Sequence, residues 1–244
     1  PMVIRTMTGA GFGTGGQHAD YLEAWFAHTA GIKVVAPSNP ADAYGLMLSC
    51  IFDDDPCLFI ENMPTYWNPG PAPASGERIP LGKANVLRPG SDVTVISYSR
   101  PVADCAAVAD KLGKEGVNVE LIDLRTIAPY DAETVLNSVA RTKRAVIVHE
   151  AVKPFGVGAE IAARINEELF GQLKSKVERV GANFSPVPFA KTLETEFVPT
   201  QARIEAAIKA EQIRLAQENE KAQFTLDQYR VEQNESISKY KLEQ

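Results

Sequence analysis

Short apolar runs alternate with stretches of helical apolar spacing from the first residues to about residue 60. The apolar runs predict buried strands at residues 3–4, 32–36 and 57–60. The amphipathic stretches predict helices at 19–27 and 41–51, and a Ser-Asn-Pro sequence opens the second of these. Continuous apolar strands separated by helices are typical of a parallel sheet covered on both faces.

Residues 63–82 interrupt this alternation with five prolines and three glycines, which predicts an extended segment crossing between two domains. The alternation then resumes. Further strands are predicted at 93–97, 117–122, 144–148 and 177–180. Helices are predicted at 102–112, 132–139 and 156–170. The pattern therefore predicts two successive α/β domains.

The amino-acid composition changes after Gln201. Residues 206–244 are rich in Gln, Glu and Lys, have scattered apolar positions, and contain no Gly or Pro. Such residues are good helix formers, so a solvated or partner-bound helix is one prediction. A frayed or disordered tail is the alternative, and the composition does not choose between them. No period of 20–50 residues recurs, which excludes repeat folds.

Composition and charge narrow the class of protein. The chain has 244 residues, 45% hydrophobic and 23% charged, as in an ordinary globular protein. Its net charge is −6 and it lacks a Lys/Arg block, so no nucleic acid is expected as a partner. No apolar run approaches the roughly 20 residues of a membrane span, so no membrane is expected either.

The cysteines and the first residues add two expectations. Cys50, Cys57 and Cys105 cannot all pair, and their apolar setting favours a reducing compartment. The chain also opens inside a predicted strand, which indicates a piece of something longer.

The stretch from Gly9 to His18, GAGFGTGGQH, is the most unusual in the chain. Glycine at this density lets a backbone turn sharply or approach a ligand closely. A Gly-x-Gly-x-x-Gly match begins at Gly11, which would fit dinucleotide binding if an acid followed the next strand. That strand is followed by Pro-Ser-Asn, and Asp42 comes only in the next helix. The nicotinamide interpretation is therefore disfavoured.

His18 lies where a helix is predicted to begin after the glycine loop. A neutral imidazole there could exchange hydrogen bonds or a proton with a ligand, and a structural role as a cap or core residue is the alternative. His28, predicted at the far end of the same helix, and His149, at a strand end, are interpreted as structural. The three histidines are too widely separated to suggest a metal site.

Three carboxylates, at Asp53, Asp54 and Asp55, follow the helix predicted over 41–51. Acidic groups at a helix C-terminus oppose its dipole, so a compensating cation is one interpretation and a solvated turn is the other. A divalent ion on the side chains and a monovalent ion on the backbone carbonyls fit the spacing equally well.

Several separated segments resemble one known family. They are residues 17–28 (QHADYLEAWFAH), 31–37 (GIKVVAP), 45–56 (GLMLSCIFDDDP), 90–97 (GSDVTVIS), 121–129 (LIDLRTIAP), 149–151 (HEA), 156–161 (GVGAEI) and 186–189 (PVPF). Their order is similar to that in the beta subunit of the thiamine-diphosphate-dependent 2-oxo acid dehydrogenases. This subunit belongs to the decarboxylating first component of the pyruvate, branched-chain and acetoin complexes. The resemblance extends from residue 1 to about residue 209.

The resemblance implies an α/β fold in which part of a transketolase-like pyrimidine-binding domain precedes a transketolase-type C-terminal domain. Its boundaries would be 1–62 for the first domain, 63–88 for a linker, 89–209 for the second domain, and 210–244 for a polar tail. It implies thiamine diphosphate and Mg²⁺ as cofactors, shared with or held by partner chains.

The resemblance also assigns residues. His18 matches the family histidine that lines the substrate channel and hydrogen-bonds thiamine-bound intermediates. The family has a monovalent-cation site, usually for K⁺, formed mostly by backbone carbonyls. By position, that site would comprise Met2, Cys50, Ile51, Asp53 and Asp55. No residue of this chain is assigned to the thiamine cofactor itself.

The chain departs from the family pattern at its start. A family beta subunit has well over a hundred residues before the first strand seen here, and they carry the glutamate that activates the cofactor. Glu23 does not match that position, and the Gly-Asp-Gly motif for diphosphate and Mg²⁺ is absent. The chain alone is therefore not expected to be active.

The partners implied are an alpha-type subunit, a chain or segment supplying the missing N-terminal part, a second beta copy, and a lipoyl acyltransferase core. The expected location is the cytoplasm, or the mitochondrial or plastid matrix in a eukaryote. The main hypothesis is a subunit of a 2-oxo acid dehydrogenase. A non-catalytic assembly or dimerisation module derived from that family is the alternative, and a ketose synthase is less favoured. The sequence does not identify the 2-oxo acid.

Overall fold

The computed structural model describes residues 1–70, 72–211 and 223–230. The chain divides into two compact units, Pro1–Ile208 and Lys209–Gln244. No helix among the described residues is long and apolar enough to cross a membrane. The helix predicted over 206–244 is observed at 206–211 and at 223–230, and the remaining residues of that prediction lie outside the described part.

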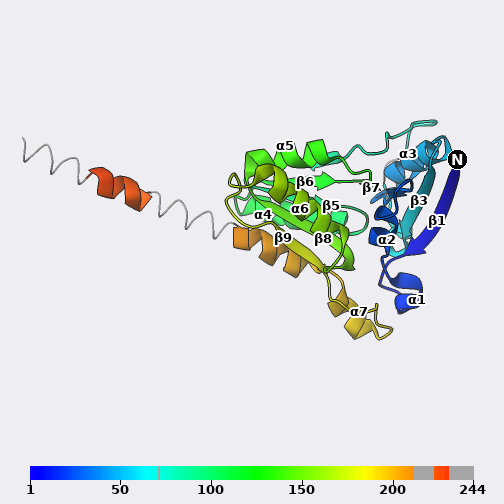
Figure 1. The fold of residues 1–244 in the computed structure, drawn as a ribbon. Coiled ribbons are helices and arrows are strands. Elements are labelled where there is room, and N and C mark those ends of the chain that lie inside the picture. The colour runs from blue at the N-terminus through cyan, green and yellow to red at the C-terminus, as the bar shows by residue number, and fades with distance from the viewer. Residues whose placement is uncertain (71, 212–222, 231–244) are drawn as a thin grey trace, which may run out of the picture. The chain divides into compact units, whose positions relative to one another are not determined.

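The first sheet has the strand order β1-β3-β2-β7. Its strands are β1 (Met2–Thr8), β2 (Lys33–Val35), β3 (Pro56–Asn62) and β7 (Thr126–Ala128). β1 and β2 both pair with β3 in parallel, whereas β7 pairs with β2 antiparallel. The associated helices are α1 (Gly16–Ala19), α2 (Glu23–Ala27) and α3 (Pro40–Ile51) (Figure 1).

The second sheet has the order β4-β6-β5-β8-β9. Its strands are β4 (Asn85–Arg88), β5 (Val93–Ser97), β6 (Val119–Asp123), β8 (Ala145–Val152) and β9 (Glu178–Ala182). All neighbours are parallel except β4, which runs antiparallel to β6. The helices are α4 (Pro101–Lys114), α5 (Ala132–Thr142), α6 (Val157–Leu169), α7 (Lys191–Phe197) and a helix that begins at residue 201.

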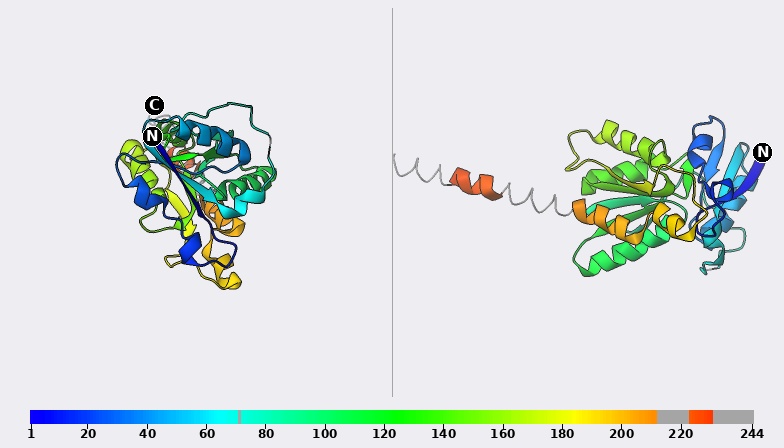
Figure 2. Two further views of the ribbon diagram at one scale, coloured as in Figure 1. Left: turned by 90° about the vertical axis from the view of Figure 1, so that its right-hand side faces the viewer. Right: turned by 90° about the horizontal axis from the view of Figure 1, so that it is seen from below.

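Helices cover both faces of the second sheet, as its continuous apolar strands require (Figure 2). Alternate residues of β5 show this. Ile96 packs into a core shared with α5 and α6, whereas Val95 packs into a core shared with α4 and with Ile204 and Ile208. The fully buried strands and the two helical layers confirm the predicted α/β fold class.

The core on the α5 and α6 side continues into the first sheet. Val34 and Leu58, from β2 and β3, belong to the same buried cluster as Ile96 and Ile147, from β5 and β8. Each of those four side chains is almost fully buried. The two sheets therefore share one apolar core rather than meeting across a polar gap.

The predicted helix over 19–27 is wrong in its extent. The structure has two short helices there, α1 and α2, separated at Asp20–Leu22. The carboxylate of Asp20 accepts a hydrogen bond from the backbone N–H of Val187, and Asp20 itself adopts an extended backbone at φ −59°, ψ 130°. His18 and His28 consequently lie on different helices.

Four elements went unpredicted. β4 lies in the segment that was expected to be a linker. β7 comes from the second half of the chain but pairs with β2 in the first sheet. The other two, α7 and the start of the helix at residue 201, follow β9. β4 and β7 are also the antiparallel strands, so neither sheet is purely parallel. Residues 63–67, the start of the expected linker, form a 3₁₀ helix, η1 (Met63–Trp67).

Candidate functional site

The glycine loop joins β1 to α1 and has a left-handed backbone at alternate residues. Gly9 has φ 106° and Gly15 has φ 64°, values that other residues rarely adopt. A Cβ atom at Gly9 would overlap the side-chain amide of Asn62, and one at Gly15 would overlap the ring of Phe189. Both the backbone conformation and the close packing thus require glycine at these positions.

A buried carboxylate from the end of β8 holds the start of this loop. Glu150 Oε1 accepts a hydrogen bond of 2.7 Å from the backbone N–H of Ala10, and its Oε2 accepts one of 2.6 Å from Asn62 Nδ2. Arg100 donates to the carbonyl oxygen of Ala10 at 2.7 Å. Burial raises the pKa of Glu150, while the nearby Arg100 guanidinium opposes that rise.

A second buried carboxylate holds the middle of the loop. Glu194, on α7, accepts a hydrogen bond of 2.6 Å from Gly11 N–H through Oε1. Its Oε2 lies 3.1 Å from the N–H of Gly13. In Figure 1, α1 and α7 lie at the same end of the Pro1–Ile208 unit, as these contacts require. The loop is thus rich in glycine yet has fixed hydrogen-bond partners.

His18 lies on α1, directly after the loop, and its side chain is exposed. The backbone around it is well anchored. The Thr8 hydroxyl lies within hydrogen-bond distance of the carbonyl oxygens of Ala19 (3.1 Å) and Asp20 (2.8 Å), and Gly15 O accepts from the N–H of His18 at 3.2 Å. The structure therefore presents this imidazole at the surface on a rigid support.

The other two histidines lie elsewhere. His28 is the C-terminal cap residue of α2 and is exposed. His149 is fully buried, its Nδ1 lies 3.1 Å from the carbonyl oxygen of Ala151, and burial lowers its pKa to about 4. Within the described residues, no group of three or more His, Cys, Asp or Glu side chains is arranged to hold a metal ion.

The residues expected at the cation site come together at one corner of the first sheet. Met2 begins β1 and pairs with Pro56, the residue after Asp55, while Cys50 and Ile51 end α3. The carboxylates there already have a cationic partner, because Lys33 Nζ lies 2.6 Å from Asp53 Oδ1 and 3.2 Å from Asp55 Oδ2.

The ion pair and burial each affect the protonation of one group at this corner. The Lys33 ammonium lowers the pKa of Asp53, and burial raises the pKa of the Cys50 thiol. The side chains thus offer no thiolate, and both carboxylates already contact the Lys33 ammonium. A cation at this corner would depend on the backbone carbonyls at the end of α3, of which that of Cys50 already accepts a hydrogen bond of 3.4 Å from the N–H of Asp53.

A buried acid at the junction of the two sheets was not singled out from the sequence. Glu23, on α2, is fully buried, and its Oε1 accepts a hydrogen bond of 2.7 Å from the hydroxyl of Tyr98. Desolvation raises the pKa of Glu23 to about 8, so the carboxyl is largely protonated at neutral pH. The Tyr98 ring also stacks on His149, with 6.3 Å between ring centroids. The sequence signal was an acid with apolar neighbours on both sides in the helix predicted over 19–27.

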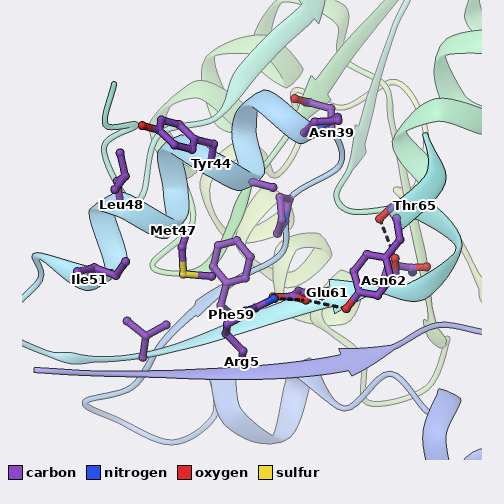
Figure 3. A pocket seen from close by; sticks show the side chains of 15 residues that line it. Arg5, Asn39, Tyr44, Met47, Leu48, Ile51, Phe59, Glu61, Asn62 and Thr65 are labelled. Atoms are coloured by element: carbon purple, nitrogen blue, oxygen red, sulfur yellow. Dashed lines mark hydrogen bonds and ion pairs between the residues drawn. The ribbon is translucent and has the colours of Figure 1, made fainter. Parts of the chain in front are cut away.

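Two of the cavities in the described part of the chain are bordered by elements near the first sheet. One of about 720 Å³ lies between β1, β3 and α3 and includes Tyr44, Met47 and Phe59 in its lining (Figure 3). On its polar side, Glu61 pairs with Arg5 and accepts a hydrogen bond of 2.6 Å from Tyr66. The other, of about 940 Å³, is bordered by α2 and by the segment after β8. His18 lines neither cavity.

Two family models together match most of the chain. The transketolase pyrimidine binding domain matches residues 1–66, and the transketolase C-terminal domain matches residues 82–204. The chain is 42% identical over 209 residues to the acetoin:2,6-dichlorophenolindophenol oxidoreductase subunit beta of Cupriavidus necator, covering 86% of this chain and 62% of that protein. It is also 42% identical over 214 residues to the mitochondrial pyruvate dehydrogenase E1 component subunit beta of Homo sapiens, covering 86% of this chain and 60% of that protein.

A solved structure shares the fold. It is described as a split gene transketolase, an inactive beta4 tetramer, and it superposes with a TM-score of 0.70 at 20% identity. The match covers 85% of this chain and 64% of that one. The chain thus spans about three fifths of the length of the curated relatives reported above. The comparisons confirm the predicted resemblance and the predicted transketolase-type domains.

Proposed function

Because this chain belongs to the transketolase family, whose C-terminal domain it carries, and is similar to beta subunits of pyruvate and acetoin enzymes, we propose that it works as such a subunit. Its activity would be the thiamine-diphosphate-dependent decarboxylation of a 2-oxo acid, with transfer of the acyl group to a lipoyl carrier. The observation that carries this proposal is the exposed His18 at the end of a glycine loop that two buried carboxylates hold in place.

His18 would act from this chain on a cofactor anchored by other polypeptides. When bound, thiamine diphosphate supplies the electron sink for decarboxylation, and the protein supplies orientation and proton donors. An imidazole can donate hydrogen bonds from its ring N–H groups and, when neutral, can accept a proton on its other ring nitrogen. Its exposure on the surface of the single chain is consistent with a site completed by a partner.

Partners are part of the proposal, because this chain aligns with only about three fifths of its relatives. They would be an alpha-type subunit holding the diphosphate and Mg²⁺, a chain or segment supplying the remaining pyrimidine-binding residues, a second beta copy, and a lipoyl acyltransferase core. The exposed apolar residues of β1 suit such an assembly. Met2, Ile4 and Met7 all lie on that strand and are largely solvent-exposed in the isolated chain.

The test is reconstitution of the full chain with an alpha-type subunit and the missing segment, followed by comparison of His18→Ala with His28→Ala. Both imidazoles are exposed, and His28 lies outside the glycine loop, so it is a matched control. Removing a general acid or base lowers turnover by about 10²–10⁴-fold, so His18→Ala is expected to fall in that range while His28→Ala stays near wild type. Wild-type turnover in His18→Ala would contradict the assigned role.

A K⁺ ion at the Asp53 corner is a separate part of the proposal. Lys33 already occupies the Asp53 and Asp55 carboxylates, so the ion would bind mostly through the backbone carbonyls of Met2, Cys50, Ile51, Asp53 and Asp55. A ligand that binds only the folded state raises the melting temperature with its concentration. Melting at constant ionic strength in KCl and in LiCl tests this directly. Equal melting temperatures in the two salts would count against the ion.

A further inference from the structure

The glycine loop receives its main anchors from residues far along the chain. Ala10 and Glu150 are 140 positions apart, and Gly11 and Glu194 are 183 positions apart. Both carboxylates are almost fully buried, at 3% exposure each. The position of α1 therefore depends on the second half of the chain, although α1 follows β1 directly.

We propose that Glu194, together with Glu150, is a positioning residue that fixes the glycine loop and thereby the location of His18. The proposal rests on the function assigned to His18 above, and it adds two acidic residues that act through the backbone. Neither carboxylate needs to touch a substrate or a cofactor. Each acts by accepting hydrogen bonds from backbone N–H groups that the loop cannot pair by itself.

The packing around α7 supports this role. Phe197, on the same helix as Glu194, is buried in a cluster with Ala10, which lies in the loop, and Ala19, which lies on α1. Phe189, just before α7, lies against the backbone of Gly15. The carboxylate, the two aromatic rings and the loop thus form one packed unit, so a shift of α7 would move the loop with it.

Of the two acidic residues, Glu194 is the better one to substitute in a test of the anchoring role. Glu150 also binds Asn62 and lies near Arg100, so its removal would disturb β3 and α4 as well. By contrast, both carboxylate oxygens of Glu194 face the loop. Glu196 is two residues along the same helix and is exposed, so Glu196→Ala is a matched control for loss of a carboxylate from α7.

The first measurement is amide hydrogen exchange in the full chain, which requires no activity. Loss of hydrogen bonds to a charged acceptor is expected to speed exchange at Gly11 and Gly13 by about tenfold or more in Glu194→Ala. Glu194→Gln, which retains one acceptor oxygen, is expected to fall between Glu194→Ala and wild type. Unchanged exchange at Gly11 and Gly13 in Glu194→Ala, matching Glu196→Ala, would overturn the inference.

The second measurement is a double-mutant cycle in the reconstituted assembly. If Glu194 acts through His18, Glu194→Ala lowers kcat with little change in KM, and it causes no further loss in the His18→Ala background. Additive losses in kcat would overturn the link to His18. The two proposals fail separately. Wild-type turnover in His18→Ala refutes the role of the histidine, whereas unchanged amide exchange in Glu194→Ala refutes the anchoring.

Discussion

The two sheets of this chain differ in how completely their strands are buried. Every residue of β5 and of β6 is buried, and so is every residue of β8 except the last. In β1, at the edge of the first sheet, a single residue of seven is buried. The central strands of the second sheet bury their apolar side chains within the chain, and exposure there is confined to Val86 and Leu87 of the short edge strand β4. In the first sheet, the longer edge strand β1 leaves Met2, Ile4 and Met7 exposed.

We infer from this difference that the two sheets have different roles in the molecule. The second sheet supplies the rigid core and, through Glu150 and α7, the contacts that hold the glycine loop. The first sheet carries that loop and an exposed apolar surface suited to contact with other polypeptides. One half of the molecule thus provides support, and the other half provides contact surfaces.

The largest expected effect compares one isoleucine from each sheet. Ile147, in β8, is fully buried, so Ile147→Ala is expected to lower the free energy of unfolding by about 3–4 kcal/mol. Ile4, in β1, is 42% exposed, so Ile4→Ala is expected to cost less than about 1 kcal/mol. Urea unfolding of the full chain measures both. Equal losses would mean that β1 is far better covered in solution than in this structure.

The next effect concerns the boundary between the sheets, where Glu23 meets Tyr98. The pKa of Glu23 is raised from 4.5 to about 8 in the folded state, so the unfolded chain ionises first as pH rises. Its contribution to stability is therefore complete below pH 4.5 and is lost as pH rises towards 8. Near pH 7, about 2.5 pH units above the unfolded pKa, this loss is on the order of 3 kcal/mol.

Glu23→Gln tests that contribution, because glutamine keeps an acceptor for the Tyr98 hydroxyl but cannot ionise. Relative to wild type, the variant is expected to gain free energy of unfolding between pH 5 and pH 8. Unfolding curves at several pH values in one buffer series check this. A constant difference between the two proteins over that range would show that Glu23 titrates normally.

The smallest effect lies in the first sheet, at the ion pair of Lys33 with Asp53. Both side chains are partly exposed, so Lys33→Met is expected to cost less than about 1 kcal/mol near neutral pH. The pKa of Asp53 is lowered in the folded state, so this contribution is present above its unfolded pKa and is lost as the carboxyl protonates in acid. Thermal melting at pH 7 and pH 3 should show a difference that is smaller at the lower pH.

Much of the fold could be predicted from the sequence because the second sheet is buried on both faces. Its strands form uninterrupted apolar runs, and the expected strand over 93–97 matches β5 in both bounds. The helix expected over 41–51 also matches α3 closely, since Asn39 caps it and accepts a hydrogen bond from Asp42 N–H. These elements are specified by local signals.

The elements that were missed depend on contacts between distant residues. β7 has three residues and becomes a strand because it pairs with β2, more than ninety positions earlier in the chain. The break between α1 and α2 follows from Asp20 binding the backbone of Val187. No local pattern encodes either pairing.

The candidate site was also only partly predictable, because some of its contacts join residues far apart in the sequence. The glycine loop and His18 were evident from composition and spacing, and the role of that histidine stays a prediction. The carboxylate of Glu194 was not evident, because α7 has the sequence KTLETEF, which reads as an ordinary polar helix. Only the folded chain shows that this acid is buried against the loop while its neighbour Glu196 is exposed.

The edge position of β1 has a practical consequence. Among the residues that the structure describes, β1 pairs only with β3, which leaves the backbone donors and acceptors of its other side available for another strand. An extended, apolar strand of this kind can template fibrils or oligomers at high protein concentration. Samples of the isolated chain should therefore be kept dilute and monitored by light scattering, and co-expression with a binding polypeptide should improve the yield of monodisperse material.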